Sequence, residues 1–338
     1  MTAAKAAARL VSEGTLSKEE IILLLENDTE DAFLYREARK KADAVFGKTI
    51  YLRGLIEISS YCKNDCLYCG LRRSNEKAAR YRLLEEDILS AAEEGYKKGL
   101  RTFVLQGGED GYFTDDRLVP VIKTMKARYP DAAITLSLGE RSKESYERLR
   151  EAGADRYLLR HETANAVHYG KLHPSAMKLS NRMECLENLK ALGYQVGAGF
   201  MVGSPYQTLE NIAEDLVFLK NFEPHMIGIG PFLPQKDTPL GGFSAGSLHL
   251  TIKLLAIIRL MHERALLPAT TALATISPGG REKGILAGAN VVMPNLSPPS
   301  VRGKYAIYDE KAFETIEEVT EKIQKIGYEI KNVRGDYK

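Results

Sequence analysis

Short apolar segments alternate with longer amphipathic segments along most of the chain. Eight apolar runs of strand length lie at residues 50–59, 102–108, 132–139, 156–162, 194–203, 225–232, 267–273 and 290–295. Helical patterns separate them, as at residues 84–99 and 208–222, so that each strand and helix together take roughly 30 to 40 residues. Eight such units predict an α/β fold of the (β/α)8 TIM-barrel type. A doubly wound open sheet is the alternative that periodicity leaves open.

The two ends of the chain carry helical patterns without strands. Residues 1–48 have apolar residues at helical spacing, with Ser17 and Glu20 placed as a capping box and Gly47 as a helix end. Residues 309–330 predict one further helix. We therefore expect three parts: an N-terminal helical extension (1–48), a barrel (49–300), and a C-terminal loop and helix that pack on the barrel (301–338).

Charge and composition exclude several classes of protein. The 47 basic and 45 acidic residues give a net charge of +2, which does not indicate binding to nucleic acid. No run of 18 apolar residues predicts a membrane span, and the first residues lack the apolar region of a signal peptide. Three of the four cysteines are clustered in a chain without a secretory signal. This favours metal or redox chemistry in the cytoplasm over disulfides.

The three clustered cysteines are Cys62, Cys66 and Cys69, spaced C-x3-C-x2-C directly after the first predicted strand. Thiolates are soft ligands that suit zinc or iron–sulfur clusters. A structural zinc site takes four protein ligands, yet the remaining Cys185 lies in a predicted helix and no histidine pair has zinc-finger spacing. Three cysteines on a cluster leave one iron free for a substrate or a cofactor.

This motif, with Tyr68 before its last cysteine and its place after the first barrel strand, resembles that of the radical S-adenosylmethionine (radical SAM) superfamily. The resemblance implies one 4Fe–4S cluster on the three cysteines and S-adenosyl-L-methionine chelated to the fourth iron. Cleavage of that cofactor yields methionine and a 5′-deoxyadenosyl radical. The resemblance also implies cofactor-binding roles, which fall on Tyr68, Gly107, Gly108, Glu109, Glu162, Arg182, Gly228 and Ile229.

These implied roles differ between segments of the chain. The segment from Gly107 to Glu109 would receive the methionine amino group, and Arg182 would pair with the methionine carboxylate. Glu162 would bind the ribose hydroxyls, and the backbone at Gly228 and Ile229 would pass the adenine. Glycines that let the backbone approach, and charges opposite in sign to those of the cofactor, suit these tasks.

Residues 50 to about 300 also resemble the HydE family of FeFe-hydrogenase maturases, within the biotin synthase-like group. The pairing of "RYLLRHETAN" with "PATTA" carries the resemblance most specifically. It implies radical attack on the sulfur of an iron–cysteine CO/CN precursor, with partner maturation proteins and a reductant such as ferredoxin or flavodoxin. Residues 301–338 contain no cysteine, so a second cluster has no ligands there. This argues against biotin synthase and the tyrosine lyases, whose chemistry uses one.

A substrate site is expected deeper in the barrel. Arg160 lies two residues before Glu162, so both side chains point to the same side of an extended strand. An arginine near several hydroxyls suits a carboxylate or another anion. The resemblance assigns an anion and substrate site to Thr135, Ser137, Arg160, Met226, Thr270, Thr271 and Met293. Tyr305 and Tyr308 are candidates for either the barrel mouth or the surface.

Two other functions stay open from the sequence. The first is a radical SAM amino-acid mutase such as methylornithine synthase, which an acid placed for a substrate amine would favour. The second is a non-enzymatic iron–sulfur or zinc scaffold. A simple electron carrier, however, normally saturates all four cluster irons with cysteine.

Overall fold

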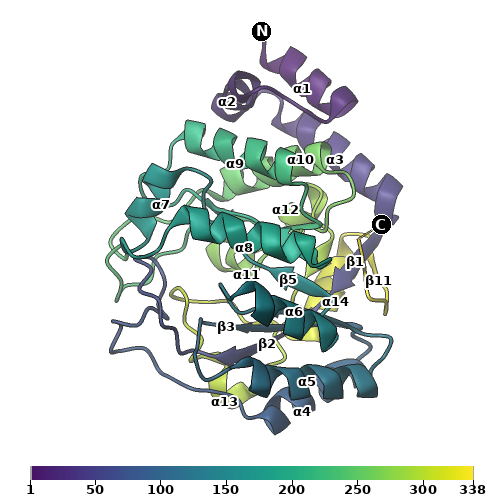
Figure 1. Cartoon of the computed structure of the whole chain (residues 1–338). Helices are drawn as coiled ribbons and strands as arrows, with labels where there is room; N and C mark the ends of the chain where they lie inside the picture. The colour runs from purple at the N-terminus through teal and green to yellow at the C-terminus, as the bar shows by residue number, and fades with distance from the viewer. Residues whose placement is uncertain (1, 338) are drawn as a thin grey trace.

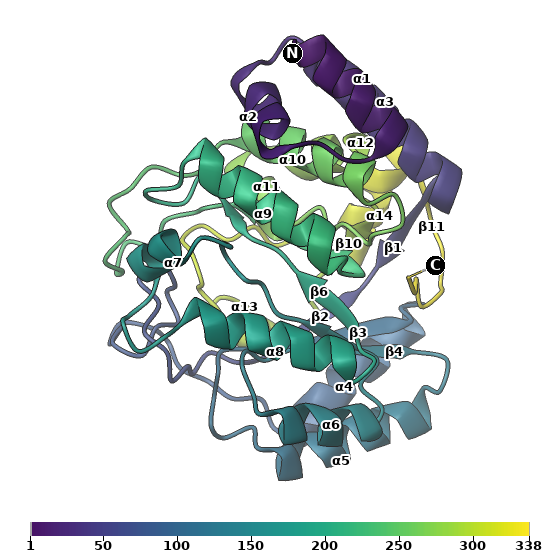
Figure 2. The same cartoon turned by 45° about the horizontal axis from the view of Figure 1, so that its top comes forward.

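The N-terminal extension forms three helices that gather at one end of the molecule. The computed structural model describes residues 2–337. The helices are α1 (Ala3–Glu13), α2 (Lys18–Glu26) and α3 (Asp31–Phe46), and they lie beside α10 (Leu248–Met261) (Figures 1 and 2). The predicted capping box of Ser17 and Glu20 is present at the start of α2. Helix α3 ends at Gly47, whose φ of 65° suits glycine.

The strands form a closed parallel barrel. Six strands pair side by side in this order: β2 (Gly54–Ser59), β3 (Thr102–Gly107), β4 (Ala133–Ser137), β5 (Arg156–Leu158), β6 (Gln195–Ala198) and β8 (Met226–Ile227). Parallel bridges from Met226 to Leu266 and from Pro268 to Val291 continue the ring. It closes where β10 (Val291–Val292) pairs with β1 (Thr49–Leu52) and Asn295 bridges Leu55. The barrel prediction is confirmed, and the open-sheet alternative is excluded.

Helices cover the outside of this barrel. They include α4 (Glu85–Lys97), α5 (Asp115–Arg128), α6 (Lys143–Glu151), α8 (Leu179–Ala191) and α9 (Leu209–Phe222) (Figure 1). Four shorter helices lie in the loops: α7 (Ala166–Leu172), α11 (Thr271–Ile276), α12 (Gly280–Leu286) and α13 (Pro299–Arg302). Within residues 2–337, no helix has the length and apolar character needed to cross a membrane.

Several predicted strands are shorter than their apolar runs. The run at 267–273 makes only bridges around Pro268, and α11 begins at Thr271, so this prediction is wrong over its second half. The run at 156–162 ends as a strand at Leu158, and Glu162, which has a left-handed backbone, makes only an isolated parallel bridge with Phe200. The runs at 194–203 and 225–232 are each interrupted, and their ends form a separate pair, β7 (Met201–Val202) and β9 (Gly230–Pro231).

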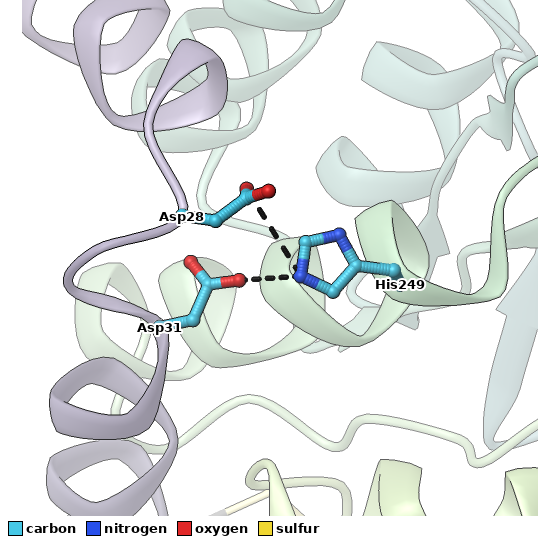
Figure 3. Close-up of side chains that lie close together, drawn as sticks. All are labelled: Asp28, Asp31 and His249. Atoms are coloured by element: carbon cyan, nitrogen blue, oxygen red, sulfur yellow. Dashed lines mark hydrogen bonds and ion pairs between the residues drawn. The ribbon is translucent and has the colours of Figure 1, made fainter.

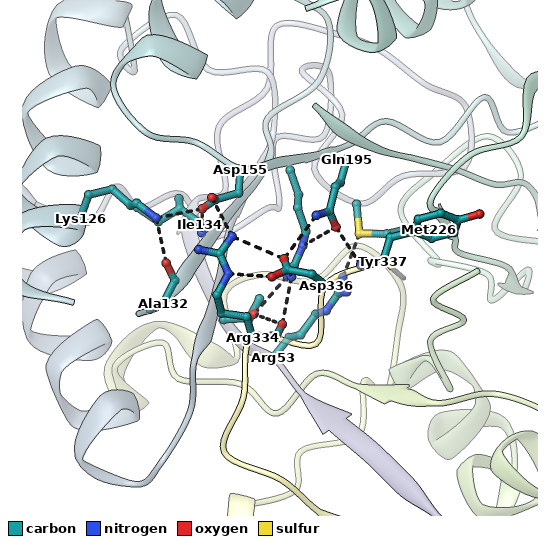
Figure 4. A network of polar contacts seen from close by, with 12 residues as sticks. Arg53, Lys126, Ala132, Ile134, Asp155, Gln195, Met226, Arg334, Asp336 and Tyr337 are labelled. Carbon is teal, nitrogen blue, oxygen red and sulfur yellow. Dashed lines mark hydrogen bonds and ion pairs between the residues drawn. The ribbon is translucent and has the colours of Figure 1, made fainter. Parts of the chain in front are cut away.

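The C-terminal region differs from the single helix predicted for residues 309–330. Helix α14 (Ile316–Lys325) starts only after Thr315, which caps it, and β11 (Glu329–Ile330) then pairs with β1. The tail continues to the amino-terminal end of the barrel strands (Figure 4). There Asp336 lies 2.6 Å from the fully buried Arg156, and Arg334 lies 2.9 Å from Asp155. The tail therefore neutralises a buried cation at the base of the barrel.

A cluster of charges joins the N-terminal extension to the barrel. His249 on α10 lies 2.6 Å from Asp31 and 4.0 Å from Asp28 (Figure 3). Lys253 lies one helical turn on, is 1% exposed, and reaches Asp28 at 2.6 Å and Asp31 at 2.9 Å. The Lys253 ammonium already pairs with both carboxylates, so we interpret the cluster as a structural ion-pair network and not as a metal site.

Lys253→Met should lower the free energy of unfolding by about 3 kcal/mol, because it leaves the buried Asp31 without its cation. Lys18→Met is the matched control, since Lys18 makes a similar ion pair with Glu214 at 2.7 Å but both side chains are about one-third exposed. Its cost should stay below about 1 kcal/mol. Urea denaturation followed by circular dichroism measures both values, and equal losses would contradict the structural role of the Lys253 cluster.

Candidate active site

The three clustered cysteines lie on one loop, residues 60–83, between β2 and α4. The loop has little regular structure, but side chains and neighbouring segments fix it. The Arg80 guanidinium donates hydrogen bonds to four of its carbonyls, those of Ser60, Leu71, Arg72 and Asn75. Backbone bonds tie Lys63 to Glu109 and Gly70 to Ile307. The cysteines are therefore held in a preformed loop at the carboxyl ends of the strands.

The thiols of Cys62, Cys66 and Cys69 are neighbours but are spaced too widely for a single metal ion. Burial raises the pKa of the Cys66 thiol, and the two other thiols raise it further. Yet among residues 2–337 the three sulfurs do not all lie within 4.8 Å of one another. Three thiolates on a tetrahedral zinc ion lie about 3.8 Å apart, since each Zn–S bond is about 2.3 Å. The three sulfurs as they lie therefore do not match three ligands of one zinc ion.

The end of β3 touches the cysteine loop at Gly108. A Cβ atom at this position would lie 2.2 Å from the carbonyl oxygen of Tyr61 and 2.8 Å from Cβ of Cys62. Only glycine permits this approach, so the segment from Gly107 to Glu109 is held directly against the loop. The contact gives a physical reason for the glycine that the sequence singled out.

A cavity of about 320 Å³ opens beside the cysteine loop. Its lining includes eight residues that the sequence analysis singled out: Tyr68, Cys69, Arg160, Glu162, Gly228, Thr270, Thr271 and Met293. These side chains come from the cysteine loop and from the ends of several strands. The structure thus brings one cysteine of the motif and four of the seven expected substrate residues to one cavity.

A second cavity of about 350 Å³ lies against the same loop and is lined by Lys63, Glu109 and Glu140 among others. Glu109 pairs with Lys63 at 3.3 Å. A Cβ atom at Gly139, where φ is 73°, would lie 2.0 Å from Cγ of Glu109. Glu109 therefore does not line the cavity that contains Arg160, and the cysteine loop borders both cavities.

Glu162 has a strained backbone at the border of the first cavity. Its φ of 66° is uncommon for a residue with a side chain and costs on the order of 1–3 kcal/mol. Its carboxylate Oε2 is buried without a hydrogen bond and forms an ion pair with Arg160 Nη2 at 3.0 Å. A strained residue at the border of a cavity is typical of a position that binds a ligand.

Arg182 on α8 is buried and fixed by two partners. Its Nε donates to Glu140 Oε1 at 2.6 Å, and its Nη1 donates to the carbonyl oxygen of Arg160 at 2.6 Å. Its Nη2 makes no hydrogen bond within the described part of the chain. Glu140 was not among the predicted site residues. It follows Gly139 after a strand, and nothing in the sequence there indicates that it binds an arginine.

Arg160 and Thr270 present unsatisfied polar atoms. Nε and Nη2 of Arg160 and Oγ1 of Thr270 are buried without hydrogen-bond partners. Nη2 forms the ion pair with Glu162 at 3.0 Å, so Nε of Arg160 and Oγ1 of Thr270 are the atoms left without a partner, whereas buried polar atoms are normally satisfied. The two side chains line the same cavity, so an anionic ligand there would satisfy them together.

Three of the predicted substrate residues, Thr135, Ser137 and Met226, do not line the first cavity, and neither does Ile229 of the predicted adenine segment. Met226 requires a correction, because its sulfur lies 2.9 Å from Nη1 of Arg53 in a separate apolar cluster. The reason is depth: Met226 starts β8, whereas Gly228, two residues closer to the mouth, borders the cavity. Thr135 and Ile229 are buried.

The lining residues that were not predicted as site residues include Glu57, Tyr308 and Lys311. Glu57 interrupts the buried strand "GLIEIS", and a charge in such a strand is a signal that could have identified it. Tyr308 had been considered for the mouth without a decision. Lys311 gave no signal, because it lies in a stretch predicted as helix that is irregular in the structure.

Comparisons with a family model and with individual proteins indicate the same family. Residues 56–219 match the model of the radical SAM superfamily. The chain is 48% identical to the FeFe hydrogenase maturase subunit HydE of Thermotoga maritima over 265 residues, which cover 78% of this chain and 75% of that protein.

Methylornithine synthase is also related. The chain is 31% identical to 3-methylornithine synthase of Methanosarcina acetivorans, covering 91% of this chain and 88% of that protein. The crystal structure of methylornithine synthase (PylB) superimposes with a TM-score of 0.85 at 28% identity, covering 96% of this chain and 97% of that one. The identity over the aligned residues is higher for the maturase, while the mutase aligns over more of the chain.

Proposed function

The chain belongs to the HydE family of the radical SAM superfamily, and on that premise we propose that it acts in assembly of the FeFe-hydrogenase active-site cluster. Radical SAM enzymes use a 4Fe–4S cluster and S-adenosyl-L-methionine, and the three-cysteine loop fits that cluster. In this proposal the substrate is an iron–cysteine CO/CN precursor attacked at sulfur. Partner maturation proteins, a reductant such as ferredoxin or flavodoxin, and a cytoplasmic location belong to the same proposal.

The cofactor-binding roles are assigned as follows. Cys62, Cys66 and Cys69 would hold the cluster, which with S-adenosyl-L-methionine supplies a 5′-deoxyadenosyl radical when both are bound. Burial raises the pKa of the Cys69 thiol to about 12, so the thiols must lose their protons when they bind iron. The rigid loop and its contact with Gly108 orient these ligands before binding.

The acids and the arginine around the loop would orient S-adenosyl-L-methionine. Glu109 lies beside the cysteine loop, where its carboxylate would bind the methionine amino group. It would then give up its ion pair with the exposed Lys63. Glu140 fixes the Arg182 guanidinium through Nε, and Nη2 of Arg182 would bind the methionine carboxylate. The Glu162 carboxylate, which Arg160 holds at 3.0 Å, would accept hydrogen bonds from hydroxyl groups.

The observation that carries the substrate assignment is the set of unsatisfied buried donors at Arg160 and Thr270. With Thr271 beside them and the apolar Met293 in the same lining, they suit an anionic, soft ligand. We also keep the division into an extension (1–48), a barrel (49–300) and a C-terminal part (301–338) as a proposal. The C-terminal part then contributes to both ends of the barrel, through Lys311 and Asp336.

One observation favours the second candidate, an amino-acid mutase. Glu57 is a buried acid in the cavity, as expected of a site for a substrate amine. However, the ammonium of Lys311 from the same chain is paired with it. The acid is therefore not free for a substrate amine, and the maturase remains the better-supported function.

Substrate dependence of S-adenosyl-L-methionine cleavage tests the proposal. We expect the reconstituted, reduced protein to form 5′-deoxyadenosine faster with a synthetic iron–cysteine CO/CN complex, and not with free lysine or ornithine. Liquid chromatography quantifies the nucleoside. Acceleration by the free amino acids alone, with an isomerised amino acid as product, would replace the maturase with the mutase.

A further inference from the structure

Both oxygens of the Glu57 carboxylate are bound by neighbouring side chains inside the cavity. Its side chain is fully buried on β2 and lines the cavity. Oε2 accepts a hydrogen bond from Nδ2 of Asn295 at 2.8 Å, and the Glu57 backbone N–H donates to Oγ of Ser297 at 2.8 Å. Burial raises the pKa of this carboxyl, and the neighbouring Lys311 and Asn295 oppose that shift. The remaining oxygen, Oε1, is therefore oriented for a cation.

The cation on Oε1 comes from a different part of the chain. Lys311 lies in residues 303–315, which we name the mouth segment and which contain no helix or strand. The Lys311 side chain is 8% exposed and lines the cavity, with its nitrogen 5.0 Å from the centre of the Tyr305 ring. A carboxylate with an aromatic face nearby is the chemistry that recognises any alkylammonium group.

The mouth segment is positioned by contacts outside the barrel strands. The Ile307 carbonyl accepts from Gly70, next to Cys69, and a Cβ at Gly70 would lie 2.0 Å from the carbonyl oxygen of Ala306. The Asp309 carboxylate accepts from the backbone of Lys236 at 2.8 Å. Lys311 is thus brought to Glu57 by a loop that rests on the cysteine loop and on the rim of the barrel.

The same cavity carries the unsatisfied donors of Arg160 and Thr270. An anion receptor and an acid in one cavity together match a molecule with an anionic group and an amino group, which is the chemistry of an amino acid. Such a molecule can bind only if its amino group displaces the Lys311 ammonium from the Glu57 carboxylate. A tethered ammonium competes at a high effective concentration, on the order of millimolar or more.

We propose that Lys311 is a specificity-determining residue: its ammonium fills an amine site built by Glu57 and Asn295, so that the cavity rejects substrates with a protonated amino group there. The proposal rests on the assignment of this cavity to the substrate, and it names the class of substrate that the protein excludes. Specificity of this kind arises from blocking the wrong ligand as much as from binding the right one.

Chemical rescue of Lys311→Ala tests the proposal on the reconstituted protein. n-Propylammonium restores the three carbons and the nitrogen that this change removes, and 1-propanol is its neutral control. At about pH 8.5 alkylammonium ions remain protonated, because their pKa is close to that of lysine, about 10.4. We expect the ammonium to bind at least about tenfold more tightly to Lys311→Ala than to the wild type, as a charge-assisted hydrogen bond implies. Calorimetric titration measures both affinities.

The double variant Glu57→Gln/Lys311→Ala should lose this binding, and 1-propanol should bind none of the variants selectively. Equal affinity in the wild type, or binding that persists in the double variant, would overturn the amine site. If Lys311→Ala does not fold, Lys311→Ser also vacates the amine position and keeps a small polar side chain in the mouth segment. It should then show the same preference for the ammonium over the alcohol.

A pair of larger probes tests the exclusion itself. The wild type should bind 6-aminohexanoate no more tightly than hexanoate, whereas Lys311→Ala should prefer the amine by at least about tenfold. A preference for the amine already present in the wild type would mean that Lys311 is displaced and does not exclude. None of these titrations requires turnover. A protein that fails to cleave S-adenosyl-L-methionine would therefore contradict the proposed function while leaving this result readable.

Discussion

Cys66→Ser should reduce S-adenosyl-L-methionine cleavage to the background of protein without iron. A serine hydroxyl is a poor ligand for iron compared with a thiolate, and the loop offers no spare cysteine to replace it. Wild-type protein reconstituted without oxygen should hold about four irons and four sulfides per chain, as one 4Fe–4S cluster requires. The measurements are iron and sulfide content and 5′-deoxyadenosine formed under reduction.

Cys185→Ser is the matched control for this loss. Cys185 is buried on α8 and its sulfur contacts the carbonyl oxygen of Arg141 at 3.7 Å. Its change should preserve the iron content and the cleavage rate. Retention of cleavage by Cys66→Ser, or bound zinc in place of iron in the wild type, would remove the cluster from the account.

Arg160→Ala should lower substrate-dependent product formation by roughly 100-fold, since about 3 kcal/mol of charge-assisted hydrogen bonding to a buried anion is lost. Arg160 lines the cavity, and its guanidinium has a buried Nε without a partner while Nη2 is paired with Glu162. A single-turnover assay with the iron–cysteine complex measures the effect. The loss should appear mainly as a higher substrate concentration needed for the half-maximal rate.

Arg160→Lys separates charge from geometry. It keeps a cation beside Glu162 but cannot form a two-pronged contact, so it should restore only part of the activity. Arg148→Ala is the control for an arginine outside the site, because Arg148 is half exposed on α6 and pairs with Asp116. Full activity in Arg160→Ala would contradict the assignment of the substrate cavity.

The sequence allowed the barrel and much of the site to be predicted, because both depend on local patterns. The strand and helix repeat identified the eight units, and the cysteine spacing identified the loop. The polar residues at strand ends predicted the cavity lining, since parallel strands bring their carboxyl ends together. Arg160, Thr270 and Cys69 therefore line one cavity.

The remaining features depend on contacts that are distant in the chain. The left-handed backbone of Glu162 has no signal in its neighbours, and the strand predicted to reach it ends at Leu158. Met226 and Gly228 differ only in depth along one strand, which periodicity does not resolve. The pairing of Lys311 with Glu57 joins positions 254 residues apart, so neither residue alone predicted it.

Activation of a FeFe hydrogenase tests the central claim most directly. Apo-hydrogenase is incubated with the other maturation proteins, S-adenosyl-L-methionine and a reductant, with and without this protein in place of the usual HydE subunit. The account predicts hydrogen evolution that depends on this protein and is lost with Cys66→Ser. A protein that cleaves S-adenosyl-L-methionine normally yet leaves the hydrogenase inactive would contradict the maturase function.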